Sequence, residues 1–165
     1  MKKVIISLAA VALSIIGIAG VHQAPQSAPQ TVHACTSVNG LPDAICTPGA
    51  IDTRVTQNNI QTTICKPGYT ATVRPAQSYT YKLKIQGIKD YGYTDTRTSS
   101  YEEDHLISLE LGGSPDDPKN LWPENPPTPN PKDSVENELH RRVCNGSITL
   151  KDAQIKISKD WRNAL

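Results

Sequence analysis

Apolar and polar positions divide the chain into segments with different periods. The first segment is an unbroken apolar run over residues 4–20, which follows Lys2 and Lys3. No acidic residue occurs before Asp43. A basic start followed by an apolar run is typical of a secretory signal peptide, which we place at residues 1–24. The alternative is a signal anchor that stays in the membrane.

The next tract, residues 25–40, is rich in Pro, Gln, Ser and Ala. Such a composition buries too little apolar surface to order itself, so we predict a flexible linker. Residues 41–165 are then expected to form a single domain.

Apolar residues at helical spacing predict two helices in the first half of this domain. One covers residues 56–64, with Thr56 as its N-cap and a Lys-Pro-Gly turn after it. The other begins at a cap on Ser78 and runs to Tyr91, where Gly92 ends it. Its apolar stripe is expected at Tyr81, Ile85 and Ile88.

A period of two residues replaces the helical period over residues 101–111, which predicts a strand that ends at Gly112 and Gly113. A loop over residues 114–119 leads to a second short strand at 120–122, which Pro123 is expected to end. Residues 123–131 contain five prolines and can form neither a helix nor an inner strand.

Two further helices are predicted at the C-terminal end. Residues 132–144 place Val135, Leu139 and Val143 on one face, and Asn145-Gly146 is a stop signal. Thr149 and Asp152 form a reduced capping box for the second helix, whose buried stripe is expected to be Leu150, Ala153, Ile157 and Trp161. The fold class predicted from these elements is α+β.

The charge balance changes once the signal peptide is removed. The 165 residues contain 17 Lys and Arg against 16 Asp and Glu, a net charge of +1. Without Lys2 and Lys3 the counts are 15 and 16, which gives −1. This balance excludes a strongly basic nucleic-acid-binding surface. Acidic residues are concentrated in 98–131, and basic residues in the two C-terminal helices.

The chain has four cysteines, an even number that in an exported protein predicts two disulfides. Of the three possible pairings we expect Cys35 with Cys46 and Cys65 with Cys144. The long second loop would constrain the unfolded chain most. A zinc site is the alternative, but no C-x-x-C pair is present.

The tetrapeptide Glu102-Glu103-Asp104-His105 stands directly before the apolar strand positions. Three consecutive carboxylates repel one another, so they are either solvated or compensated by a cation. A bound metal ion would be one such cation.

The stretch Asp-His-Leu-Ile-Ser-Leu-Glu-Leu-Gly-Gly, followed by Asn-Leu-Trp-Pro-Glu and then by the helix at 132–143, resembles the HNH, or ββα-metal, nuclease family. The resemblance covers residues 101–144, about a quarter of the chain. It implies a ββα-metal core of two short antiparallel strands and a helix around one divalent cation, here with additional helices and disulfides. The whole chain is also similar to small secreted actinobacterial proteins that carry this module, which implies a secreted or extracytoplasmic bacterial protein.

The resemblance also implies residue roles. His105 would be the general base, for which an imidazole pKa near neutrality is suitable. Asp104 would be a ligand to Mg²⁺, Mn²⁺ or Zn²⁺. Asn120 matches the middle asparagine, whose side chain holds the loop so that the histidine points correctly.

The ligand on the helix departs from the family pattern, because the proline loop changes the spacing. The pairs Asp133 with Asn137 and Glu136 with His140 are each one turn apart. Of these residues, Asn137 is the preferred metal ligand and His140 the second. Strand geometry adds a condition: Asp104 and His105 point to opposite faces and share one cation only where the strand ends or bulges.

These residues predict a secreted metal-dependent endonuclease that acts on DNA or RNA and has no stable membrane association after cleavage of the signal. Lys132, Arg141 and Arg142 would steer phosphate toward the metal. Arg74 is either another phosphate contact or a solvated loop residue. Two alternatives are a non-catalytic exported cell-envelope or binding protein that retains the ββα scaffold, and a hydrolase of another phosphodiester.

Overall fold

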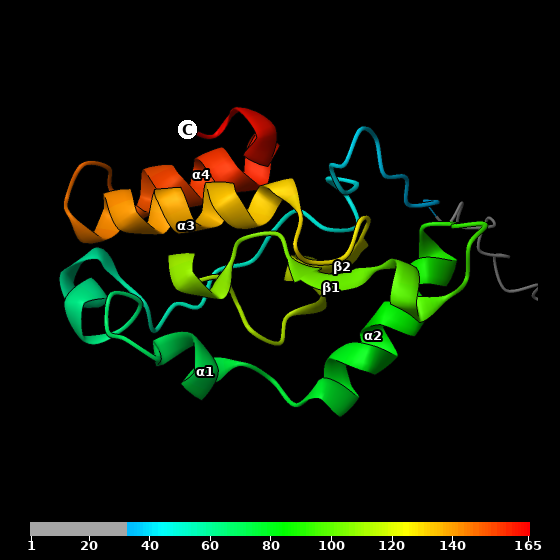
Figure 1. The fold of residues 1–165 in the computed structure, drawn as a ribbon, viewed down its shortest axis with the longest axis horizontal. Helices are drawn as coiled ribbons and strands as arrows, with labels where there is room; N and C mark the ends of the chain where they lie inside the picture. The colour runs from blue at the N-terminus through cyan, green and yellow to red at the C-terminus, as the bar shows by residue number, and fades with distance from the viewer. Residues whose placement is uncertain (1–32) are drawn as a thin grey trace, which may run out of the picture. The chain divides into compact units, whose positions relative to one another are not determined.

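The computed structural model describes residues 33–165 (Figure 1). The signal peptide predicted at 1–24 and the first part of the predicted linker lie outside these residues. Residues 33–40 of that linker are held by the Cys35–Cys46 disulfide. The backbones of Val38 and Leu41 also exchange two hydrogen bonds of 3.0 Å.

In the described residues, four α-helices and several 3₁₀ helices surround a short two-stranded hairpin. The helices are α1 (Tyr69–Val73), α2 (Gln77–Asp90), α3 (Pro131–Cys144) and α4 (Leu150–Asp160), and the strands are β1 (Glu102–His105) and β2 (Leu121–Glu124). The 3₁₀ helices are η1 (Gln57–Thr62), η2 (Thr98–Ser100), η3 (Leu109–Leu111), η4 (Pro118–Asn120) and η5 (Trp161–Asn163). The predicted mixture of helices and short strands is confirmed.

β1 and β2 form a two-stranded antiparallel sheet in which Asp104 is opposite Trp122 and His105 is opposite Leu121. α2 contacts both strands, and α3 packs beside α4 and against η3 (Figure 1). The approach of α2 to β2 requires Gly87, because a Cβ there would lie 2.7 Å from the Pro123 ring.

The larger hydrophobic core lies between η1, η3, α3 and α4. It buries the predicted stripes of the last two helices, namely Val135, Leu139, Val143, Leu150, Ala153 and Ile157. Trp161, the last residue of the second predicted stripe, is partly buried in η5. The predicted cap is confirmed, because the Thr149 hydroxyl accepts a hydrogen bond from the Asp152 N–H.

The first predicted strand is too long. β1 ends at His105, and the apolar residues after it turn into η3. Leu106, Ile107, Leu109 and Leu111 are all buried, so their spacing reflects burial on every side rather than one face of a strand. The second strand continues through Pro123 to Glu124, which is possible because an edge strand tolerates the missing N–H of proline.

The first half of the domain also departs from the prediction. Residues 57–62 form a 3₁₀ helix, α2 begins after Ala76 rather than Ser78, and α1 was not predicted. On α2, Ile88 is buried but Tyr81 and Ile85 are exposed. The expected apolar stripe is therefore wrong at two of its positions.

Both predicted disulfides are confirmed. Cys35 is bonded to Cys46 and Cys65 to Cys144, with Cα–Cα distances of 5.9 and 5.6 Å. Two disulfides indicate an oxidising, extracytoplasmic environment. None of the helices between residues 33 and 165 is both long enough and apolar enough to span a bilayer.

Candidate functional site

His105 is the last residue of β1, and only 7% of its surface is exposed. Its Nε2 atom lies 2.9 Å from the carbonyl oxygen of Pro115. A carbonyl only accepts, so Nε2 carries a hydrogen, and in the neutral imidazole Nδ1 is then unprotonated. Within residues 33–165, Nδ1 has no hydrogen-bond partner. This tautomer presents Nδ1 as a proton acceptor.

The surroundings of His105 also favour its neutral form. Burial of the ring is the largest cause that lowers the pKa of His105, and the charges of Arg74 and Lys132 act in the same direction. The Pro115 hydrogen bond and the Asp104 carboxylate act against them. Because the pKa lies below the usual 6.5, the imidazole is neutral at pH 7 and suited to act as a general base.

Asp104 points to the other face of the sheet. One of its oxygens accepts a hydrogen bond of 2.9 Å from the Trp122 indole, and the other lies 2.9 Å from Lys132 Nζ. The pairing of β1 with β2 is regular, without a bulge. Within the described residues, neither Asp104 nor His105 belongs to a set of three potential metal ligands. The structure therefore does not bring these two side chains to a shared cation.

Lys132 supplies the positive charge that compensates Asp104. Its side chain is 1% exposed, and its ammonium donates to Asp104 Oδ1 at 2.9 Å, to the His105 carbonyl at 3.0 Å and to the Glu136 carboxylate. Burial alone would lower the pKa of Lys132, but the charges of Asp104 and Glu136 outweigh it and raise that pKa. All three N–H groups are used. The expected role of Lys132 in steering phosphate is inconsistent with this buried position.

A divalent cation does not fit this arrangement. The three oxygens around Lys132 are hard donors of the kind that Mg²⁺ and Mn²⁺ prefer. They enclose one position, however, and the ammonium fills it. A metal ion at Asp104 would have to replace Lys132.

Burial raises the pKa of the other carboxylates of the hairpin and so favours their protonated form. Glu102 is paired with Glu124 across the strands, and the Asn130 amide lies 3.4 and 3.3 Å from their oxygens. Burial raises the pKa of Glu124 to about 9 and that of Glu103 to about 8. One oxygen of Glu103 is buried without a partner. At pH 7 Glu103 and Glu124 are therefore protonated, while Asp104 is paired with Lys132.

Asn120 is fully buried and holds the loop between the strands. Its Oδ1 accepts from the N–H groups of Ile107 at 3.0 Å and Ala50 at 3.3 Å. Its Nδ2 donates to the carbonyls of Ile107 at 3.0 Å and Ser114 at 2.9 Å. The neighbouring Gly113 is required, because a Cβ there would lie 1.7 Å from the Ile107 oxygen. This loop carries Pro115, which in turn orients His105.

The two expected helix ligands lie away from Asp104. Asn137 is exposed, and its amide donates to the Asp133 carbonyl of its own helix. His140 has its Nε2 2.9 Å from the Ile64 carbonyl and its Nδ1 3.7 Å from Glu110.

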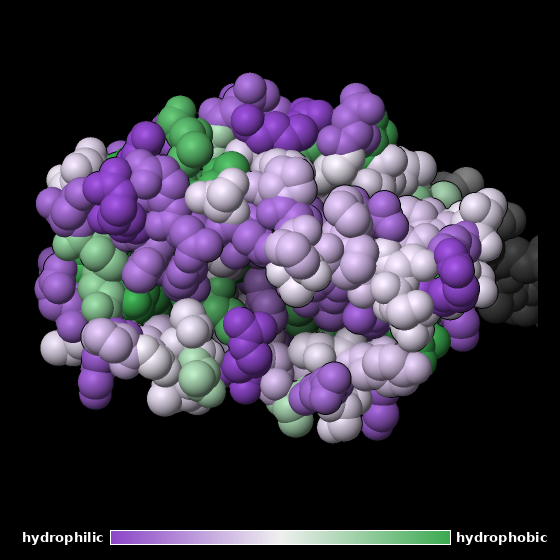
Figure 2. Space-filling view, in the orientation of Figure 1, coloured by the Kyte–Doolittle hydropathy of each residue, from purple (hydrophilic) through white to green (hydrophobic). Residues whose placement is uncertain are grey.

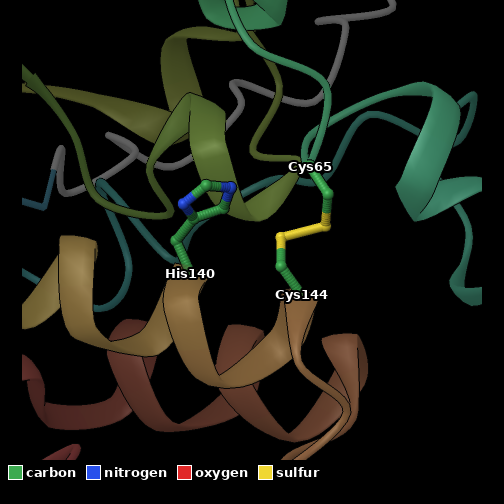
Figure 3. A group of neighbouring side chains, drawn as sticks. All are labelled: Cys65, His140 and Cys144. Atoms are coloured by element: carbon green, nitrogen blue, oxygen red, sulfur yellow. A yellow bond between two sulfur atoms is a disulfide. The ribbon is translucent and has the colours of Figure 1, made fainter.

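Two other groups of residues have ligand atoms close enough to hold a metal ion. In one, His140 lies beside Cys65 and Cys144 (Figure 3). The other consists of His33, Asp43 and Cys46. In both groups the cysteine sulfurs are joined in disulfides, so they are not the thiolates that bind metals strongly.

Arg141 and Arg142 are at the far end of α3. Both lie 2.7 Å from a carboxylate oxygen of Glu138. Arg141 is about 13 Å along the helix axis from Lys132. Their charge is therefore partly balanced and distant from His105.

A hollow of about 320 Å³ lies between α1, η3 and the first turns of α3. Figure 2 shows this face of the molecule hollowed between α3 and α1, with hydrophilic residues on both sides. The hollow is lined by Thr70, Arg74, Ser108, Leu109, Glu110, Asp133, Glu136 and Asn137. Sequence reasoning did not assign Ser108 and Glu110 to a site, because their apolar neighbours indicated only a strand.

Comparisons with models of known protein families, with curated proteins and with solved structures found no match to this chain. A functional assignment therefore depends on the side chains described above.

Proposed function

We propose that the protein is an exported endonuclease that hydrolyses phosphodiester bonds of DNA or RNA, with His105 as the general base. The observation that carries this proposal is the hydrogen bond between Nε2 of His105 and the Pro115 carbonyl. It fixes the tautomer in which Nδ1 can accept a proton from an attacking water molecule. The lowered pKa of His105 keeps this nitrogen unprotonated at pH 7.

The order of elements supports the same proposal. β1 and β2 are antiparallel and α3 follows them, which is the order of a ββα core. Asn120 ties both ends of the connecting loop together, as the asparagine of the resembling family does. In this role Asn120 positions His105 through Pro115 and does not itself touch a substrate.

The resemblance to the HNH family also implies a divalent metal ion, but the site residues do not support this part. Lys132 fills the position between Asp104 and Glu136. Proton transfer to His105 Nδ1 needs only the imidazole and a water molecule. The dependence on Mg²⁺, Mn²⁺ or Zn²⁺ stays a prediction of the resemblance.

The test is nicking of supercoiled plasmid and cleavage of single-stranded RNA by the purified protein. Each reaction is run with Mg²⁺, Mn²⁺ or Zn²⁺ and with EDTA. We expect cleavage by the wild type and a loss of at least about 100-fold in His105→Ala, the size of a general-base contribution. Absence of cleavage under every condition, or cleavage that His105→Ala retains, would contradict the proposal.

One observation favours a second function, that of a non-catalytic exported binding protein on the same scaffold. The Lys132 ammonium has the three oxygen partners that a catalytic cation would need. A protein that is folded, as judged by circular dichroism, and inactive in all the reactions above would support this second function.

A further inference from the structure

Arg74 differs from every other arginine of the chain. The sequence has six arginines, all within the described residues. Five of them lie within 2.8 Å of a carboxylate: Arg54 with Asp52, Arg97 with Asp95, Arg141 and Arg142 with Glu138, and Arg162 with Asp160. Among residues 33–165, the Arg74 guanidinium has neither an ion pair nor a hydrogen bond. It is an uncompensated, exposed cation.

The backbone fixes the position of Arg74. Arg74 directly follows α1, and its N–H donates to the Thr70 carbonyl at 3.0 Å. Pro75 comes next, which restricts Arg74 to an extended conformation and ends the helix. The side chain borders the hollow between α1, η3 and α3.

The same hollow contains an unused hydrogen-bond donor. The hydroxyl of Ser108 is buried and has no partner in the described part of the chain, and Ser108 lines the hollow with Arg74. Buried polar atoms in folded proteins are nearly always hydrogen-bonded, so an orphan hydroxyl and an unpaired guanidinium that line the same hollow indicate a missing acceptor. The positive charge of Arg74 also contributes to lowering the pKa of His105.

We infer that Arg74, with the Ser108 hydroxyl as a second donor, binds a phosphodiester oxyanion in this hollow. A role of this site in catalysis rests on the function proposed above. The binding itself does not depend on that function.

The acidic residues of the hollow determine which anion is accepted. Each already has a partner: Glu136 has Lys132, Glu110 has His140, and Asp133 accepts from Thr128 and Asn130. In the described residues none of them forms an ion pair with Arg74, and their acidic character disfavours an anion of higher charge. A diester carries one negative charge and a terminal phosphate nearly two, so the hollow should prefer internal diester groups of a strand to free phosphate.

The experiment measures binding of a fluorescein-labelled thymidine decamer to the full chain carrying His105→Ala, which prevents cleavage. In this background we expect Arg74→Gln to weaken binding about 10-fold. The slope of log K against log salt should fall by about 0.7, the value for one phosphate contact on a single strand. Ser108→Ala should weaken binding by a smaller factor, and inorganic phosphate should compete poorly with the decamer.

Arg97→Gln is the matched control, because Arg97 is also exposed but is paired with Asp95. It should leave both the affinity and the salt slope unchanged. Equal affinity and equal salt slope in Arg74→Gln and its parent would overturn the inference. Loss of binding in Arg74→Gln combined with no cleavage by the wild type would support the anion site while rejecting the nuclease.

Discussion

The first three residues of β1 carry carboxylates, and each is stabilised differently. Asp104 forms an ion pair with Lys132 at 2.9 Å. Glu102 lies near the Asn130 amide, and burial raises the pKa of Glu103 to about 8. The expectation that a cation compensates this run is correct for Asp104 alone, and the cation is a lysine rather than a metal ion.

Glu103 gives a pH dependence whose sign follows from its pKa. Since the pKa rises from 4.5 in the unfolded chain to about 8 in the fold, the folded state binds the extra proton between these values. The stability contributed by Glu103 is complete below pH 4.5 and is lost as the pH rises through about 8.

We expect Glu103→Gln to remove this loss. Its free energy of unfolding should exceed that of the wild type by about 1 to 3 kcal/mol at pH 9, the cost of a buried unsatisfied group. At pH 4.5 the two proteins should be nearly equal. The measurement is urea unfolding at both pH values, and an identical difference at the two would show that Glu103 ionises freely in the fold.

At the scale of elements, Lys132 joins the first turn of α3 to β1 through Asp104 and the His105 carbonyl. Removing one member of a buried ion pair leaves an uncompensated charge, which costs about 3 to 5 kcal/mol. Lys132→Ala should be destabilised by this amount at pH 7. The carboxylates of Asp104 and Glu136 would then face an emptied position suited to a divalent ion.

We therefore expect Mn²⁺ to raise the midpoint of thermal unfolding of Lys132→Ala and to leave that of the wild type unchanged. The double variant Asp104→Asn/Lys132→Ala lacks one of the two carboxylates and should respond less. An equal rise in the wild type would show that a metal ion binds without displacing the ammonium.

The sequence predicts an element correctly where its pattern of apolar residues has a single physical cause. α3 and α4 follow from apolar residues on one helical face, such as Leu139 and Ile157, and their ends follow from capping residues. Residues 106–111 depart from the predicted strand because burial on all sides imitates the alternation of a strand. The burial of Lys132 had no local signal, since a lysine in the first turn of a polar helix is usually solvated.

The sequence likewise predicts only part of the candidate site. Asp104, His105 and Asn120 were found because they are adjacent to the glycine loop and its strands. Arg74 and Ser108 belong to segments 34 residues apart in the sequence, and only the packing of α1 against η3 brings them to one hollow. Local sequence patterns do not show which distant segments pack against each other.

At the scale of the whole molecule, two disulfides constrain the described residues. Cys65–Cys144 closes a loop with a sequence separation of 79, against 11 for Cys35–Cys46. Loop-closure entropy predicts losses of about 4.5 kcal/mol when Cys65–Cys144 is removed and about 3 kcal/mol when Cys35–Cys46 is removed. We expect Cys65→Ala/Cys144→Ala to be the less stable double variant in urea unfolding at pH 7. The reverse order would show that the chain entropy of the longer loop is not the dominant contribution.

In the proposed reaction, His105 takes the proton from water during phosphodiester hydrolysis. The most direct test compares plasmid nicking by His105→Ala and His140→Ala, because each histidine has its Nε2 2.9 Å from a backbone carbonyl. We predict that His105→Ala loses at least about 100-fold in rate, while His140→Ala retains the wild-type rate. Equal rates for the two variants would contradict the assignment of His105 as the base.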